Sequence, residues 1–224
     1  MRVLSLIHED DAPSGIFGDV ARERGHELVE WNFRRGRPPA PGDYDAYLVF
    51  GGAMHVDQEH EHPWLREEDD LLRELLDRGA PVFGVCLGGQ LIAKSAGAEV
   101  GPAEQPEVGW FDVELTAEGT DDPVLGQLPQ RFQAFQWHSY AFELPPGAVP
   151  LARNSAGLQA YRVGNRAWGV QFHPEVTQEI VQSWLEFEEG KPERPDLDFA
   201  PLPRWNQLGR RLCAAFLDAA SAKP

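Results

Sequence analysis

Cysteine is scarce in this chain of 224 residues, which contains only Cys86 and Cys213. Two cysteines cannot build a disulfide framework, so they indicate a reducing compartment, and we expect a cytoplasmic protein. Long apolar runs are missing too. The opening stretch, MRVLSLIHEDD, is far too short for a signal-peptide core or a membrane span and is better interpreted as a first strand. We therefore expect no membrane as a partner.

Basic residues are also few. Lys and Arg number 20 against 36 Asp and Glu, which gives a formal net charge of −16. Such a surface repels a phosphate backbone, so nucleic acid is excluded as a partner. Hydrophobic residues make up 42% of the chain and charged residues 25%, a composition that excludes a disordered protein and is ordinary for a globular one.

Strand-like and helix-like segments alternate in the first half of the chain. Short apolar runs at 2–7 and 46–52 end in turn residues, and 64–79 carries leucines at helical spacing with acids between them. We interpret those acids as a solvated face. A nearly uniform apolar run at 80–86 then precedes a helix-like segment at 87–97. This alternation predicts an α/β fold with a mostly parallel sheet.

The second half changes character. Five closely spaced segments resemble strands and predict added antiparallel strands, namely 108–115, 131–138, 149–154, 158–163 and 167–173. Helical patterns return at 177–190 and 204–220, and the proline-rich 191–203 between them is interpreted as a surface connection. We expect a single domain over 1–224, in which 190–224 is a linker plus a C-terminal helix.

Cys86 lies between glycines, in GVCLGGQ, where a predicted strand ends and a predicted helix begins. Ligands of open α/β sheets bind at this edge. The glycines permit a tight turn that exposes a nucleophile, and a helix N-terminus favours a thiolate and offers N–H groups to an oxyanion. The alternative is a buried structural cysteine beside glycines that close packing requires.

His173 is the one of seven histidines with an obvious orienting partner. Pro174 favours an extended backbone at His173, and in an extended chain Glu175 lies on the same face, where it can accept the imidazole N–H. Cys86, His173 and Glu175 therefore form a candidate triad. The alternative is a histidine that ends a strand beside a surface acid. His138 has no acid at the same spacing, and we interpret it as a structural residue or as part of the rim of the site.

The motifs GVCLGGQ and GVQFHPE, in this order, resemble the nucleophile and histidine–glutamate motifs of class I glutamine amidotransferases. The resemblance extends through FGGAMHV, the segment from Pro63 to Val100 and QWHSY, and covers about 1–185, while the segment after Gly190 is not diagnostic. It implies a flavodoxin-like open sheet with helices on both faces. It also implies hydrolysis of the glutamine side-chain amide through a γ-glutamyl thioester, with release of ammonia.

By position, the resemblance makes Cys86 the nucleophile, His173 the general base and acid, and Glu175 the group that orients the histidine. It also implies that the backbone N–H groups of Gly52 and Leu87 bind the oxyanion. Many family members have proline where this chain has Ala53. Because the loop of small residues at 51–53 can rotate a peptide cheaply, we expect the Gly52 N–H to point away until a partner binds.

The resemblance further implies substrate contacts from the Gln90 side chain and from the backbone of Ser139 and Tyr140. The segment HVDQEHEHPW contains three histidines and an aspartate, but its spacing matches no common zinc motif. We interpret it as a polar loop beside the active site. The sequence therefore predicts no metal and no cofactor.

Three functions remain open from the sequence. No P-loop or synthetase segment is recognisable, so a separate synthetase or acceptor subunit could take the ammonia from glutamine. Alternatively, the substrate is another γ-glutamyl peptide or amide, cleaved by the same triad with water as the final acceptor. A third interpretation, from another class, is a non-enzymatic flavodoxin-like protein with Cys86 as a redox sensor, although a sensor does not need the histidine–glutamate pair.

Overall fold

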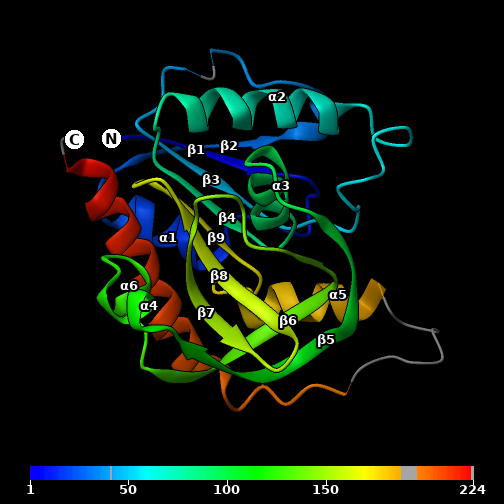
Figure 1. Cartoon of the computed structure of the whole chain (residues 1–224), viewed down its shortest axis with the longest axis vertical. Helices are drawn as coiled ribbons and strands as arrows, with labels where there is room; N and C mark the ends of the chain where they lie inside the picture. Colours follow the sequence, from blue (N-terminus) through cyan, green and yellow to red (C-terminus); the bar gives the residue numbers. More distant parts are fainter. Residues whose placement is uncertain (41, 188–195, 223–224) are drawn as a thin grey trace.

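The computed structural model describes residues 1–40, 42–187 and 196–222. Within these residues, one sheet of nine strands runs in the order β2-β1-β3-β4-β9-β8-β7-β5-β6 (Figure 1). The first five strands in this order are mutually parallel, and each later neighbour is antiparallel. The predicted α/β sheet with added antiparallel strands is therefore confirmed.

The parallel strands are β1 (Arg2–Ile7), β2 (Glu27–Asn32), β3 (Ala46–Val49), β4 (Val82–Val85) and β9 (Ala167–Val170). The antiparallel strands are β5 (Val100–Leu115), β6 (Arg131–Phe142), β7 (Val149–Asn154) and β8 (Gly157–Val163). Our sequence analysis did not identify β2, since this edge strand keeps every side chain at least partly exposed and has no buried apolar run.

Helices cover both faces of the sheet, as expected. The long helices are α1 (Gly15–Glu23), α2 (Trp64–Asp77), α3 (Leu87–Ser95), α5 (Gln178–Phe187) and α6 (Leu202–Ser221), and the short ones are α4 (Ala117–Asp121), η1 (Phe33–Arg35) and η2 (Leu125–Gln127). Helices α1 and α6 pack together on one face, and α2 packs with α3 on the other (Figure 1). Each face has its own hydrophobic cluster, so the sheet is the middle of three layers.

Helix α6 is part of the core. Leu212, Cys213 and Phe216 are fully buried. The helix also approaches the segment that carries His173, because a Cβ at Gly209 would lie 2.1 Å from the carbonyl oxygen of Pro174. Residues 191–195 of the predicted surface connection lie outside the described residues.

Helix α2 corrects one expectation. Its acids do not all form a solvated face, because Glu68 is completely buried. Glu68 lies three residues after Leu65 and three before Leu71, so it falls on the apolar stripe of the helix. Among the described helices, none combines the length and apolar character needed to cross a bilayer.

Candidate active site

Cys86 lies on a strained turn between β4 and α3. Its backbone has φ 51° and ψ −111°, a left-handed conformation that a residue with a Cβ adopts at a cost. A Cβ at Gly88 would lie 2.0 Å from the carbonyl oxygen of Val49, so the first turn of α3 presses against the end of β3. The glycines thus serve close packing, and the same packing forces the sharp turn at the cysteine.

The parallel pairing of β4 and β9 brings His173 to the same edge. Val85 and Val170 are register partners, and the chain reaches His173 three residues after Val170. The N–H of His173 donates to the carbonyl oxygen of Phe135 over 2.8 Å, and its own carbonyl accepts from Nε1 of Trp205 over 2.8 Å. These backbone bonds fix the histidine in place.

The imidazole of His173 is oriented by Glu175, whose Oε1 lies 2.8 Å from Nδ1. Both side chains are buried, and the edge of the Trp184 ring packs against the imidazole with 5.1 Å between centroids. With Nδ1 engaged, Nε2 remains free for chemistry; within the described residues it makes no hydrogen bond.

Charge on the neighbours keeps His173 protonated. Burial lowers the pKa of His173, but the negative charge and hydrogen bond of Glu175, together with the adjacent sulfur of Cys86, outweigh burial and raise the pKa from 6.5 to about 10. At neutral pH the imidazole is therefore a cation, able to give a proton from Nε2.

Cys86 and His173 open to one small cavity of about 130 Å³. Gly51 contacts both, since a Cβ there would lie 3.2 Å from Cε1 of His173 and 3.7 Å from Cβ of Cys86. The cavity has an acidic and aromatic lining, formed by Glu9, Asp11, Ala12, Gly52, Ala53, Cys86, Trp137, His173 and Trp184. A partly open cavity beside a cysteine and an imidazolium can admit a small neutral carbonyl group.

The two expected oxyanion donors lie next to this cavity. Gly52 lines it, and Leu87 is the first residue of α3, directly after the cysteine. A Cβ on Gly52 would lie 3.3 Å from Cδ2 of Leu87, so the two residues are in contact. Within the described part of the chain, neither backbone N–H donates to a backbone carbonyl.

The three residues expected to contact the substrate lie outside the lining of this cavity. Gln90 is buried, and its Nε2 donates to the carbonyl oxygen of Tyr140 over 3.0 Å and to Oε1 of Gln171 over 3.3 Å. Ser139 is exposed. The structure brings Gln90 and Tyr140 together, but none of the three expected residues is among those that line the cavity.

Gln171 is a residue of the site that our sequence analysis missed. Its Nε2 lies 3.7 Å from Sγ of Cys86, within the range of a hydrogen bond to sulfur. Gln171 precedes His173 by two residues in the segment that follows β9, and the side chains of both residues lie beside Cys86. The position two residues before the histidine could therefore have indicated Gln171 from the sequence.

His138 has no acid at the spacing of Glu175, but it does form a buried pair with an acid that is distant in the sequence. Its Nε2 lies 3.1 Å from Oε2 of Glu107, and its Nδ1 lies 3.0 Å from the carbonyl oxygen of Tyr140. Glu107 is the register partner of His138 on the neighbouring strand β5. Cross-strand pairing of this kind leaves no local spacing in the sequence, so it could not be read there.

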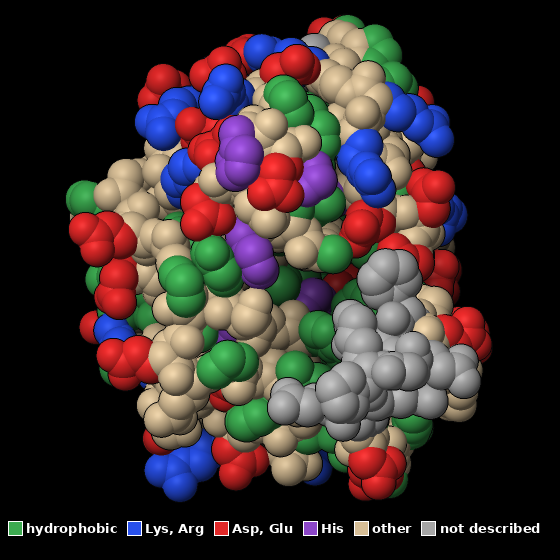
Figure 2. Space-filling view, turned by 90° about the vertical axis from the view of Figure 1, so that its right-hand side faces the viewer, with side chains coloured by type: hydrophobic (Ala, Val, Ile, Leu, Met, Phe, Trp, Pro, Cys, Tyr) green, Lys and Arg blue, Asp and Glu red, His purple; other side chains and the backbone are tan. Residues whose placement is uncertain are grey.

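The segment 55–62 contains three histidines and Asp57, residue types that can bind a metal. His55 stacks on Tyr140 with 3.8 Å between ring centroids, and the Tyr140 hydroxyl donates to Asp57 over 3.2 Å. Histidine side chains gather on one face of the molecule among acidic ones (Figure 2). Even so, no group of three or more His, Cys, Asp or Glu able to hold a metal is found in the described residues.

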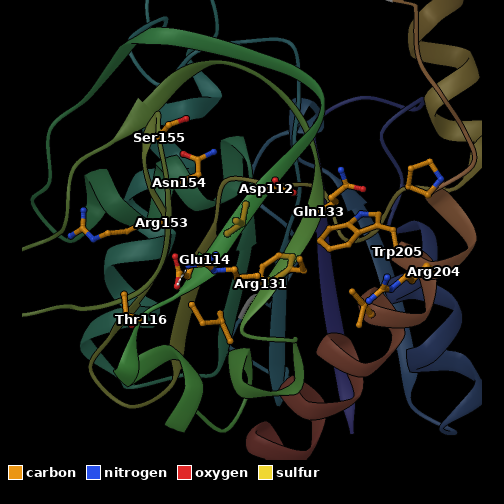
Figure 3. Close-up of a pocket in the computed structure, with 15 residues that line it drawn as sticks. Asp112, Glu114, Thr116, Arg131, Gln133, Arg153, Asn154, Ser155, Arg204 and Trp205 are labelled. Atoms are coloured by element: carbon orange, nitrogen blue, oxygen red, sulfur yellow. Dashed lines mark hydrogen bonds and ion pairs between the residues drawn. The ribbon is translucent and has the colours of Figure 1, made fainter.

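A larger cavity of about 730 Å³ lies elsewhere, where β5, β6 and β7 approach the first turns of α6 (Figure 3). Asp112, Glu114 and Arg131 reach into it from exposed positions, and none of the triad residues lines it. Trp205 lines this larger cavity, and its Nε1 donates to the carbonyl oxygen of His173. The smaller cavity is therefore the candidate active site.

Comparisons with known proteins identify the family of this chain. The sequence profile of the family Glutamine amidotransferase class-I matches residues 20–188. The glutamine amidotransferase-like protein YfeJ of Salmonella typhimurium is 28% identical over 97% of this chain and 96% of its own length. Among solved structures, a glutamine amidotransferase from Thermotoga maritima has a TM-score of 0.88, with 27% identity and coverage of 99% of both chains.

Two further relatives have named reactions. The glutamine-hydrolysing GMP synthase of Aeropyrum pernix is 36% identical over 54% of this chain and 25% of its own length. A gamma-glutamyl-L-1-hydroxyisopropylamide hydrolase from a Pseudomonas species is 33% identical over 61% of this chain and 48% of its own length. This chain therefore matches about a quarter of the first protein and about half of the second.

Proposed function

The chain belongs to the class I glutamine amidotransferase family, and on that premise we propose that it hydrolyses the side-chain amide of glutamine through a γ-glutamyl thioester on Cys86. The observation that carries this proposal is one cavity of about 130 Å³ into which a cysteine on a strained turn and a histidine held by Glu175 both open. A reducing cytoplasm would keep Cys86 as a thiol.

In the first half of the reaction, Sγ of Cys86, whose proton has passed to Nε2 of His173, attacks the amide carbon, and the C=O electron pair moves onto oxygen. The His173 imidazolium then gives its Nε2 proton to the leaving nitrogen, the C–N bond breaks, and ammonia departs. The raised pKa of His173 keeps this proton available at neutral pH.

In the second half, neutral His173 takes a proton from water, and the water oxygen attacks the thioester carbon. The tetrahedral intermediate collapses with loss of the Cys86 thiolate, and glutamate leaves. In both halves the backbone N–H groups of Gly52 and Leu87 would bind the oxyanion, which is the state that the enzyme must stabilise most. Glu175 holds the ring of His173 in one orientation throughout.

Recognition of the amino-acid end of the substrate is proposed for two sets of groups. Glu9 and Asp11 line the cavity and place negative charge where a substrate ammonium group can reach it. Gln90 and the backbone of Ser139 and Tyr140 would support the substrate from the other side, with Gln90 acting through its bond to the Tyr140 carbonyl.

The ammonia acceptor distinguishes two forms of this function. Similarity to part of a GMP synthase supports a separate synthetase or acceptor subunit that takes the ammonia. Similarity to a γ-glutamylamide hydrolase supports a second candidate, a stand-alone hydrolase of γ-glutamyl peptides or amides with the same triad.

A substrate screen tests both forms. Ammonia or amine release is measured with the purified protein on glutamine, γ-glutamyl peptides and γ-glutamyl alkylamides, with Cys86→Ser as the inactive control. Turnover of glutamine supports the amidotransferase, and turnover of the alkylamides with poor use of glutamine supports the hydrolase. Absence of turnover on every γ-glutamyl compound, or full activity of Cys86→Ser, would overturn the proposed chemistry.

A further inference from the structure

His8 and Glu68 form a buried pair beside the loop that carries Gly52. His8 follows the end of β1 and Glu68 comes from α2, and Nε2 of His8 lies 3.0 Å from each carboxylate oxygen. Both side chains are fully buried, and the ring of Trp64 stacks on the imidazole with 5.5 Å between centroids. Because the desolvation of two buried charges offsets much of their attraction, stabilisation of the fold does not by itself account for this pair.

The other nitrogen of His8 reaches the active-site loop. Nδ1 lies 3.0 Å from the carbonyl oxygen of Gly51. A carbonyl oxygen can only accept, so Nδ1 must carry a proton and donate it. Burial lowers the pKa of His8, but the charge and hydrogen bond of Glu68, with the Gly51 carbonyl, outweigh burial and leave the pKa above its usual value. Glu68 therefore helps to keep the donor on His8.

The bond to Gly51 fixes the direction of the next N–H. The carbonyl of Gly51 and the N–H of Gly52 belong to one peptide, and the described residues contain no cis peptide. In a trans peptide the C=O and N–H point in opposite directions. His8 lies outside the lining of the active-site cavity, whereas Gly52 is part of it. With the Gly51 carbonyl held by His8, the Gly52 N–H of the same peptide points away from the His8 imidazole.

Two glycines in succession would otherwise let this peptide rotate. The following peptide is held as well, because the N–H of Ala53 donates to Oε2 of Glu9 over 3.0 Å. We propose that His8, held by Glu68, is a positioning residue that locks the Gly51–Gly52 peptide with its N–H turned toward the oxyanion formed at Cys86. This inference rests on the proposed function of the same site.

This arrangement differs from the partner-controlled oxyanion donor that we expected from the sequence. There, two glycines followed by Ala53 suggested a peptide that turns toward the site only when a partner binds. The structure shows this peptide already anchored through Gly51 by His8, which directly follows β1, and His8 in turn is held by Glu68 of α2. The oxyanion donor is then preformed in the isolated chain.

A matched pair of double variants tests the proposal, because both replace the buried ion pair with neutral amides. In His8→Asn/Glu68→Gln, the Asn Nδ2 occupies the place of the imidazole Nδ1 and can donate to Gly51. In His8→Gln/Glu68→Gln, the longer side chain carries its amide out to the position of Nε2 and leaves the Gly51 carbonyl without its donor. Asp69→Asn, an adjacent acid of α2 that bonds Ser95, is the control for changing a carboxylate of this helix.

We expect the Gln double variant to lose about 10²-fold in kcat with KM changed less than about threefold, since an oxyanion donor acts mainly in the transition state. The Asn double variant should have a kcat within about tenfold of the wild-type value. The control Asp69→Asn should have the wild-type kcat. Alkylation of Cys86 by iodoacetamide, which forms no carbonyl oxyanion, should proceed at the wild-type rate in all of them. Equal kcat in the Asn and Gln variants would overturn the proposal.

A structural readout separates this inference from the proposed function. If the wild type releases no ammonia or amine from any γ-glutamyl substrate, the proposed function fails, and crystal structures of the two double variants then decide the positioning. A Gly51 carbonyl that turns in the Gln variant but not in the Asn variant supports the role of His8. A carbonyl that stays in place in both would refute it.

Discussion

The backbone N–H of Cys86 donates to the carbonyl oxygen of Val170 over 2.8 Å. This bond continues the parallel ladder between β4 and β9 by one residue beyond β4. Because the carboxyl ends of parallel strands meet at one edge of the sheet, the cysteine and the histidine that follow these strands face a common cavity.

The two cysteines should differ sharply in reactivity. An electrophilic glutamine analogue is expected to label Cys86 and to leave Cys213 unmodified. Cys213 is fully buried in α6, and burial raises the pKa of its thiol, so it stays protonated. Peptide mapping by mass spectrometry identifies the labelled residue. Preferential labelling of Cys213 would contradict the assignment of the nucleophile.

Loss of His173 should cost more activity than loss of the Glu175 charge. His173→Ala removes the proton donor and acceptor and is expected to reduce kcat by about 10²- to 10⁴-fold or more. Glu175→Gln keeps the imidazole and should retain more turnover. Steady-state kinetics on well-folded variants measure both. An inactive His138→Ala beside an active His173→Ala would mean that the wrong histidine was assigned.

Activity should fall as the pH rises through about 10, because the His173 imidazolium that protonates the leaving nitrogen is lost there. Since the pKa in the folded protein lies above 6.5, the stability gained from protonation is complete below about pH 6.5 and disappears as the pH rises through about 10. A profile of kcat/KM from pH 7 to 11 measures this fall in activity. In Glu175→Gln the fall in kcat/KM should occur at lower pH. If it occurs at the same pH as in the wild type, a group other than His173 causes it.

Gly88 and Gly101 should respond differently to alanine. A Cβ at Gly88 would lie 2.0 Å from the Val49 carbonyl oxygen, so Gly88→Ala must displace α3 from β3 and should destabilise the fold by about 1–3 kcal/mol or more. A Cβ at Gly101 would meet no atom within 4 Å, and Gly101→Ala should change stability by less than about 1 kcal/mol. Denaturant unfolding compares the two. Equal losses would argue against the packing constraint beside Cys86.

Interactions between residues close in the chain could be predicted from the sequence. Glu175 orients His173 from two residues away, a spacing that is present in the motif itself, although the backbone at Pro174 and Glu175 forms a turn rather than the extended segment that we expected. The turn at Cys86 follows from flanking glycines between an apolar strand and a helix. Alternating strands and helices likewise determined the sheet and its helical layers, since hydrophobic periodicity is a local property.

Contacts between distant segments were decided only by the tertiary structure. The sequence predicted a solvated Glu68, whereas packing of α2 against the sheet buries it beside His8 and, through His8, beside Gly51. It assigned no acid to His138, because Glu107 arrives from the neighbouring strand. In both pairs the partners approach through strand order and helix packing. A residue's own neighbours in the chain carry no record of that geometry, so these pairs became visible only when the chain was folded.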